Sequence, residues 1–296
     1  MLTGYGSAVA GMIASSALFS VMSVLVRLSE GISPFTTALF RFAIGIALLS
    51  FLALLGKIKI DYRNIRILLV RGFAGGISVF LFYFSITRIG LAKGTVISNT
   101  YPLFATILGS LFLKEQIRPI SGVFVAVCIV GLVLVNHDAA AGAFLIDEWV
   151  LLAFVGSIAA AVAVVAIRKL STSDSPYSIY MSQCLFGFWM VLIPANAVPS
   201  EVGLTGAFLL LGVGVVATLA QLIMTWSYRH VHVSTGSLLS MLMTVFNVLI
   251  GTTLFKESRG IVSILGMGLI ILSCAGIVIA NRPRNETGHS AAEVKV

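Results

Sequence analysis

The sequence predicts an all-α integral membrane protein of ten transmembrane helices, arranged as two inverted five-helix repeats. Three observations predict this fold class: an apolar composition, ten apolar runs of membrane-spanning length, and one register of similarity between the two halves. Of the 296 residues, 58% are hydrophobic and only 10% are charged. Because a soluble domain carries about 25% charged residues, nearly all of this chain is expected to lie in the membrane.

The ten apolar runs each have about 20 residues, which is the length that a hydrocarbon core of about 30 Å requires. The first run follows no basic segment and is too long for a signal-peptide core, so we expect it to be retained as a span. The predicted spans are Gly6–Val26, Pro34–Leu55, Ile67–Thr87, Leu91–Leu113, Ile117–Val135, Trp149–Ile167, Tyr177–Ile193, Ala207–Ser227, Val233–Phe255 and Ile261–Ala280.

The placement of lysine and arginine predicts the orientation. With the N-terminus inside, 13 of these residues fall on the cytoplasmic side and 5 on the outer side, with Arg41 set aside as buried. The cytoplasmic set includes Arg71 and Arg168. Because cytoplasmic loops carry an excess of basic residues, we expect a multi-pass inner-membrane protein with both termini in the cytoplasm.

Internal similarity appears when the chain is shifted against itself by 142 residues. The segment SPFTTALFRFAIG, from Ser33, then aligns with SPYSIYMSQCLFG, from Ser175. Without gaps, the same register pairs Lys114-Glu115 with Lys256-Glu257. We therefore expect a first repeat over residues 1–138, a second over 139–281, and a disordered cytoplasmic tail over 282–296.

The number of spans per repeat, five, determines the side from which the second repeat enters the membrane. An odd number of spans makes the second repeat enter the membrane from the opposite side, so the repeats are related by a pseudo-two-fold axis in the membrane plane. Such inverted repeats are typical of secondary transporters, whose substrate site lies near the midplane between the halves.

Several segments of the chain resemble the EamA-type branch of the drug/metabolite transporter superfamily over about residues 7–280. The resemblance lies in ALFSVMSVLVR, ALFRF, LLVRGFAGG, FYFSITRIGLAKGTVISNTYPLFATILGSLFLKE and QLIMTWSYRHVHVSTGSLLSMLMTVFNVLIGTTLFKE. The family pattern usually has Gly-Glu where this chain has Lys114-Glu115 and Lys256-Glu257. The resemblance implies a ten-helix bundle, alternating access and small organic solutes as cargo.

The acidic and histidine residues exclude several kinds of chemistry. All 11 acids and all four histidines lie in loops, at helix ends or in the tail. We therefore expect no enzyme, metal site or cofactor, because there is no HExxH and no histidine in a span to activate a serine. Glu115 and Glu257 are expected to be solvated helix-end residues, with proton coupling as the alternative. His230 and His232 are expected to be solvated, and Cys128, Cys184 and Cys274 to be small buried hydrophobes.

Arg41 is the predicted exception to a nearly uncharged interior. Its equivalent in the second repeat is Gln183. Arg41 either faces a central cavity, where it pairs with an anionic substrate group or a structural carbonyl, or snorkels outward and fixes helix ends. We expect Arg41 to face the cavity, although the resembled family commonly has arginine here whatever the cargo.

Other polar and aromatic residues near the midplane complete the predicted substrate site. Pro102 is expected to break the fourth span, because proline removes a backbone donor and exposes the Ser98 carbonyl. The candidate substrate-binding residues are Arg41, Tyr83, Asn99, Tyr101, Gln183, Gln221, Met241, Thr244 and Asn247. The alternative role for the two asparagines is to bridge helices. Phe84 and Trp226, which are repeat equivalents, either gate the cavity or belong to the interfacial aromatic belt.

These features predict a permease that moves a small polar or amphipathic metabolite, such as an amino acid or a related zwitterion or anion. A cationic nucleoside-type cargo such as S-adenosylmethionine is the first alternative, since aromatic faces hold cations. A non-transporting membrane scaffold, without a solvated midplane cavity, is the second. The expected partners are the small-molecule substrate and the lipid bilayer, with no nucleic acid, and the expected oligomeric state is monomer or homodimer.

Overall fold

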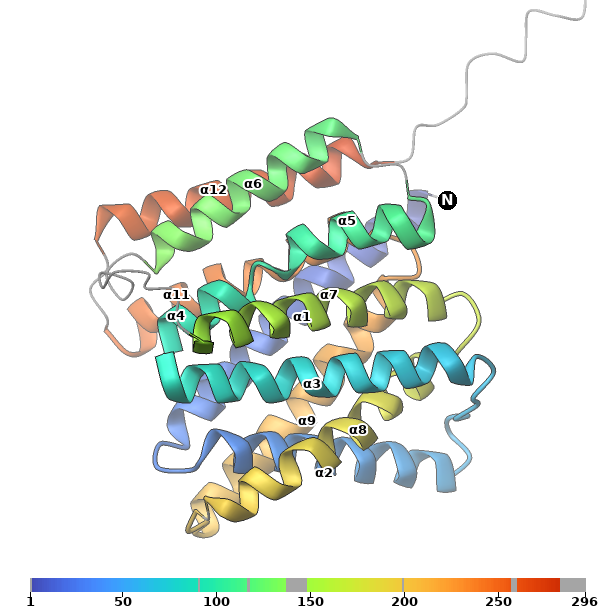
Figure 1. Cartoon of the computed structure of the whole chain (residues 1–296), viewed down its shortest axis with the longest axis vertical. Coiled ribbons are helices and arrows are strands. Elements are labelled where there is room, and N and C mark those ends of the chain that lie inside the picture. Colours follow the sequence, from blue (N-terminus) through green and yellow to red (C-terminus); the bar gives the residue numbers. More distant parts are fainter. Residues whose placement is uncertain are drawn as a thin grey trace, which may run out of the picture.

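The computed structural model describes residues 2–89, 91–115, 118–136, 148–198, 200–256 and 260–282, and within these ranges it contains helices and no strand (Figure 1). The helices are α1 (Leu2–Leu28), α2 (Pro34–Leu54), α3 (Ile65–Ile89), α4 (Leu91–Ser98), α5 (Tyr101–Leu113), α6 (Pro119–Val135), α7 (Glu148–Leu170), α8 (Pro176–Ala197), α9 (Leu204–Ser227), α10 (Val233–Ser240), α11 (Leu242–Leu254) and α12 (Ile261–Ala280).

These helices make the chain a multi-pass membrane protein. Within the described ranges, nine helical segments are long and apolar enough to cross a membrane, with α4–α5 and α10–α11 each counted as one. The tenth apolar helix, α6, has 17 residues, a length of about 26 Å at 1.5 Å per residue. The predicted boundary at residues 138 and 139 and the tail after Arg282 lie outside the described residues.

Three pairs of helices begin in the register found in the sequence. Adding 142 to the first residues of α2, α4 and α6 gives the first residues of α8, α10 and α12. The backbone repeats in detail as well. Lys114 and Lys256, which are equivalent, are the two non-glycine residues in the described part with positive φ, at 55° and 54°.

Equivalent helices run in opposite directions, as α6 and α12 show at both ends of their packed pair (Figure 1). The Arg118 guanidinium, just before α6, donates to the Ala280 carbonyl at the end of α12. At the other end, the Ser263 hydroxyl near the start of α12 donates to the Val135 carbonyl at the end of α6, at 2.7 Å. This antiparallel pair is the geometry that inverted repeats require.

Two predicted spans are each divided into two helices. In the first, α4 ends at Ser98 and α5 begins at Tyr101, as expected from Pro102, which sits in the first turn of α5 and cannot donate to the Ser98 carbonyl. The predicted span Val233–Phe255 carries a second break that the sequence did not predict, because α10 ends at Ser240 and α11 begins at Leu242. No proline explains this second break, and a tightened turn marks it, with the Thr244 N–H donating to the Met241 carbonyl at 2.9 Å.

Glycines allow α8 to pack closely between α2 and α3. A Cβ on Gly72 of α3 would lie 2.7 Å from the Ser182 carbonyl oxygen, and one on Gly187 of α8 would lie 2.4 Å from the Phe42 ring of α2. Small residues at such contacts let helix backbones approach closely in lipid. The close approach brings polar side chains of α2, α3 and α8 together.

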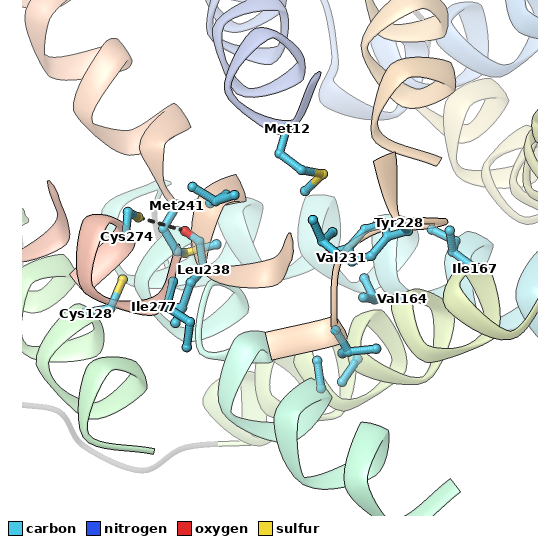
Figure 2. Close-up of a cluster of buried hydrophobic side chains, with 14 of the residues drawn as sticks. Met12, Cys128, Val164, Ile167, Tyr228, Val231, Leu238, Met241, Cys274 and Ile277 are labelled. Carbon is cyan, nitrogen blue, oxygen red and sulfur yellow. Dashed lines mark hydrogen bonds between the residues drawn. The ribbon is translucent and has the colours of Figure 1, made fainter. Parts of the chain in front are cut away.

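The largest buried apolar cluster joins the two repeats, and Figure 2 shows 14 of its side chains. Met12 of α1 and Val164 of α7 contribute to it together with Leu238 and Met241 at the second helix break. Cys274 donates its thiol to the Leu238 carbonyl at 3.2 Å. All three cysteines are buried and free, which confirms the prediction that they act as small apolar side chains.

Candidate functional site

A buried cluster of polar side chains lies where α2, α3 and α8 meet. Two arginines belong to it: Arg41 of α2 is 9% exposed and Arg71 of α3 is 2% exposed. Arg71 was counted with the cytoplasmic-side residues and Arg41 alone was expected to be buried, and the burial of Arg71 corrects that expectation. Arg71 lies six residues into α3 and points into the helix packing. Arg41 is therefore not the single buried charge of the interior.

Arg71 is held by the second repeat. Its Nη2 donates to the Gln183 Oε1 of α8 at 2.6 Å. Gly75, one turn further along α3, makes room for this pair, because a Cβ there would lie 2.1 Å from Arg71 Nη1 and 3.1 Å from Gln183 Cγ. The predicted substrate residue Gln183 thus binds an arginine across the repeat boundary.

Arg41 has aromatic neighbours. Its Cζ lies 5.8 Å from the centre of the Phe19 ring and 6.0 Å from that of Phe42, at the limit for a cation–π interaction. Tyr83 of α3, a predicted substrate residue, is buried beside the Arg41 guanidinium. Arg41 Nε has no hydrogen-bond partner among the described residues.

One turn of α8 connects the two arginines. Tyr180 and Cys184 flank Gln183 on this turn and approach α2 at Gly45, where a Cβ would lie 3.2 Å from Tyr180 Oη and 2.8 Å from Cys184 Sγ. Gly45 lies one turn after Arg41 on α2. Both guanidinium groups are within electrostatic range of Cys184. The Arg41, Arg71, Tyr180 and Gln183 side chains therefore form one group, named the arginine cluster here.

A second group of predicted residues lies at the two helix breaks. Asn99, at the α4–α5 break, and Met241, at the α10–α11 break, line the same void of about 170 Å³, which is too narrow for a water molecule. Pro102 of α5 and Cys128 of α6 also line it. The equivalent breaks of the two repeats thus face each other across a small, mostly apolar space.

The other predicted substrate residues occupy separate places. Asn247 of α11 accepts from the Ser20 hydroxyl of α1 at 2.6 Å, so it bridges two helices. The Tyr101 hydroxyl points to the Ser237 carbonyl at 3.5 Å, and Thr244 is half-buried on α11. Gln221 of α9 is buried, and its Nε2 has no hydrogen-bond partner in the described part of the chain.

The predicted gating residues lie at opposite ends of the bundle. Phe84, near the end of α3, stacks on Phe80 at 5.9 Å and meets the edge of Trp149, at the start of α7, at 5.6 Å between ring centres. Trp226, at the end of α9, is exposed and lies 5.6 Å from the His230 ring.

Glu115 joins the two repeats at the helix ends, so the expectation of a solvated side chain is wrong. One carboxylate oxygen accepts from Arg168 Nε at 2.9 Å and the other from the Val233 N–H at 2.9 Å, where α10 begins. Arg168 Nη1 in turn donates to the Tyr228 and Arg229 carbonyls after α9. We name these contacts the Glu115 junction.

Burial alone would raise the pKa of Glu115, but hydrogen bonds from His232, Arg168 and the Val233 N–H lower the pKa below its ordinary value. His232, which was expected to be solvated, is half-exposed with Nδ1 3.5 Å from the Glu115 carboxylate. Glu257, the equivalent of Glu115, lies outside the described residues.

Asp174, in the loop between α7 and α8, binds the loop before α3 in a similar way. It accepts from the backbone N–H groups of Arg63 and Asn64 and from the Asn64 amide just before α3. Burial raises the pKa of Asp174, and the hydrogen bonds from Ser173, Asn64 and Arg63 lower it more, so the net pKa is below its ordinary value. No group of histidine, cysteine and acidic residues within the described ranges is arranged to hold a metal ion.

The fold and the buried polar residues define a class: a membrane transporter built from two antiparallel repeats with broken helices at its centre. The sequence profile of the EamA-like transporter family matches residues 2–137 and 147–279. The chain therefore belongs to the EamA-like transporter family, as the resemblance predicted, and this membership indicates a transporter rather than an enzyme.

Individual relatives agree with this assignment. The chain is 27% identical over 268 residues to the pseudopaline exporter CntI of Pseudomonas aeruginosa, covering 89% of this chain and 93% of that protein. It is 24% identical over 262 residues to an uncharacterised transporter of Archaeoglobus fulgidus, covering 86% and 90%. A solved crystal structure with 16% identity has a TM-score of 0.82 over 94% of this chain and 98% of that one, which shows that the fold is shared.

Proposed function

We propose that this chain is a ten-span secondary transporter of the inner membrane that moves a small polar or amphipathic organic metabolite by alternating access. Both termini face the cytoplasm in this proposal, and the two repeats meet the bilayer from opposite sides. The pair of equivalent helix breaks that face one void is the observation that carries it. Discontinuous helices at the repeat interface are typical of substrate sites in secondary transporters.

Contacts between the two repeats lie toward both ends of the bundle. On the side of the chain's N-terminus, the Glu115 junction and the contacts of Asp174 connect the repeats. On the other side, the Ser200 hydroxyl accepts from the Ser33 N–H at 2.8 Å. Alternating access requires one set of these contacts to separate while the other stays closed, so each set is a candidate gate.

The positions of the acidic residues favour substrate exchange over proton coupling. Within the described spans, the carboxylate-bearing side chains are confined to Glu148, at the first residue of α7. Proton-coupled carriers commonly use carboxylates or histidines at membrane depth. We therefore expect substrate exchange or movement down the substrate gradient. The partners in this proposal are the substrate and the bilayer, and the protein is a monomer or homodimer.

Counterflow in proteoliposomes tests the transport function. Vesicles are loaded with one of three probe classes, namely amino acids, dicarboxylates or S-adenosylmethionine, and uptake of the matching radiolabelled probe is measured. We expect exchange for one class above protein-free vesicles. Exchange of S-adenosylmethionine alone would favour the cationic alternative. Correctly inserted protein that exchanges none of them would favour the scaffold alternative.

Crosslinking tests the alternating-access part. The Asn64 amide donates to the Ser173 hydroxyl at 2.7 Å, so the variant Asn64→Cys/Ser173→Cys can be joined by a short thiol crosslinker. We expect the joined protein to lose exchange and each single variant to keep it. Full exchange by the joined protein would contradict movement at this side.

Accessibility tests the orientation. Glu30, in the loop between α1 and α2, and Lys57, in the loop between α2 and α3, are both exposed. In intact cells, Glu30→Cys is expected to react with an impermeant thiol reagent, and Lys57→Cys only after permeabilisation. The three native cysteines are buried and give a low background. The reverse pattern would place the termini outside.

A further inference from the structure

Arg41 and Arg71 are two buried cations with unused hydrogen-bonding capacity. The Nε of each has no hydrogen-bond partner among the described residues. A buried guanidinium is normally paired with a carboxylate or bound at all its donors. The neighbouring Tyr180 hydroxyl is also without a partner in the described part of the chain. The Nε–H groups of both arginines and the Tyr180 hydroxyl therefore have no hydrogen-bond acceptor among the described residues.

The surrounding residues supply little negative charge. Gln183 offers a neutral oxygen to Arg71. The neighbours described for Arg41 are the Phe19 and Phe42 rings and the neutral Tyr83 side chain. The acidic residues in the described ranges are placed in loops or at helix ends, where Glu115 and Asp174 are already bound to other groups. The arginine cluster therefore carries a positive charge that its described protein neighbours do not neutralise.

The two arginines approach each other from opposite ends of the membrane. Arg41 lies seven residues after the start of α2, and Arg71 lies six residues after the start of α3. At 1.5 Å per residue, these positions are about 10 Å and 9 Å from opposite faces of a span about 30 Å thick. Both side chains turn to the same stretch of α8, where Gln183 and Cys184 lie, so the positive charge is concentrated near the middle of the bundle.

We propose that Arg41 and Arg71 together bind a cargo whose oxyanion oxygens carry two negative charges in total, either a dicarboxylate or a phosphate monoester. This inference rests on the transport function proposed above and narrows its substrate class. The planar guanidinium fork suits both kinds of oxyanion. The Tyr180 hydroxyl is the additional donor. Arg71 is in this view a substrate-binding residue, and Gln183 is the residue that positions it.

Calorimetric binding to the purified full-length protein in detergent at low salt tests the site. The probes are succinate and glycerol 3-phosphate, with the neutral succinamide and the cation putrescine for comparison. We expect one or both anions to bind, and succinamide and putrescine to bind at least tenfold more weakly. Which of the two anions binds separates a dicarboxylate from a phosphate source. Failure of both anions to bind, or equal binding of succinamide, would overturn the proposal without any variant.

Variants locate the binding. Arg41→Gln and Arg71→Gln are each expected to weaken anion binding roughly 10- to 150-fold, the range for loss of one hydrogen bond to a charged group. Arg66→Gln is the matched control, because Arg66 is an exposed arginine on the same helix as Arg71. If Arg71→Gln does not fold, Arg71→Lys, which keeps the charge and loses the fork, is expected to bind with intermediate affinity. Anion binding that is equal in folded Arg variants and wild type would overturn the proposal.

The site and the transport function can fail separately. An anion that binds through the two arginines in detergent but does not exchange in proteoliposomes would leave the site standing and contradict transport. Exchange of a cationic probe by a protein that binds neither anion would leave transport standing and contradict the site.

Discussion

The two repeats share a backbone and differ in charge. The pairs α2/α8, α4/α10 and α6/α12 begin at equivalent positions, the fourth span of each repeat is broken, and a lysine with left-handed backbone follows that span in both. In contrast, the buried cations Arg41 and Arg71 belong to the first repeat, and the equivalent residues in the second are Gln183 and Val213.

This difference separates two requirements of a transporter. Two opposed conformations are readily provided by repeats with the same backbone, because each repeat can adopt the shape of the other. Recognition of a chemically asymmetric solute needs different side chains on the two halves. The second repeat keeps the backbone and supplies a neutral amide that holds Arg71 in place.

The largest expected effect comes from giving the second repeat the charge of the first. Gln183→Arg puts a third guanidinium next to Arg71, where Gln183 Oε1 now lies 2.6 Å from Arg71 Nη2. Two like charges about 4 Å apart repel by ~4 kcal/mol at an effective dielectric constant of 20. We expect a loss of stability of about that size, measured as a lower Tm and less folded protein by size-exclusion chromatography.

The double variant Arg41→Gln/Gln183→Arg is its matched partner, since it moves the charge to the equivalent position without adding one. It is expected to recover part of the lost Tm. A Gln183→Arg protein as stable as wild type would contradict the contact between the Arg71 and Gln183 side chains.

The next effect concerns the Glu115 junction. Glu115→Gln keeps an acceptor for the Val233 N–H but leaves the partly buried Arg168 without its carboxylate. We expect a loss of about 2 kcal/mol, the size of one hydrogen bond between charged groups, seen as a lower Tm. Glu30→Gln, an exposed acid, is the control and should leave Tm unchanged.

The pH dependence of this effect has a definite sign. The folded pKa of Glu115 lies below the ordinary value of 4.5. Its contribution to stability is therefore complete above the unfolded pKa and is lost as the pH falls through the lower folded value. The Tm difference between wild type and Glu115→Gln should be constant near neutral pH and shrink in acid below about pH 4.5. A difference that grows in acid would contradict the lowered pKa.

A smaller effect is expected from making Gly75 resemble its equivalent, Ala217. The new Cβ of Gly75→Ala would overlap Arg71 Nη1, so Arg71 and Gln183 must shift. Such overpacking costs about 1–3 kcal/mol, and we expect weaker binding of whichever anion the wild-type protein binds in the same calorimetric assay, as well as a lower Tm. The reverse change, Ala217→Gly, should lower Tm by helix propensity and lost methyl burial, about 1–2 kcal/mol, with binding unchanged. Weaker binding in Ala217→Gly but not in Gly75→Ala would contradict the assigned site.

The smallest effect tests the symmetry of the backbone. Lys114 and Lys256 both have φ near 55°, a conformation that disfavours side chains with a Cβ and suits glycine. Lys114→Gly and Lys256→Gly are each expected to raise stability by about 1 kcal/mol, measured by chemical or thermal unfolding. Because the backbones match, the two gains should be equal, and a gain at only one position would show that the repeats differ there.

The sequence was sufficient for the membrane class, the repeat register and most helix bounds, because hydropathy is a local signal and the repeat appears in a direct comparison of the chain with itself. The Pro102 break was predictable for the same reason, since a proline acts on its own helix. Of the arginine cluster, Arg41 and Gln183 were identified as polar residues inside spans. Arg71 was counted with the cytoplasmic-side residues and not as a buried charge, although its position inside the predicted span Ile67–Thr87, one turn before Gly75, was a signal that was available.

Contacts between the repeats were decided by tertiary packing. Arg71 and Gln183 are 112 positions apart, and Glu115 and Arg168 are 53 apart. The periodicity of a single helix therefore cannot predict that these residues pair. The close packing of α3 against α8 at Gly72 and Gly75 selects the buried orientation of Arg71, and the ends of α5, α7 and α9 meet only in the folded bundle. A charge near a helix end can reach solvent or turn inward with similar local geometry, and the neighbouring helix determines which of the two is available.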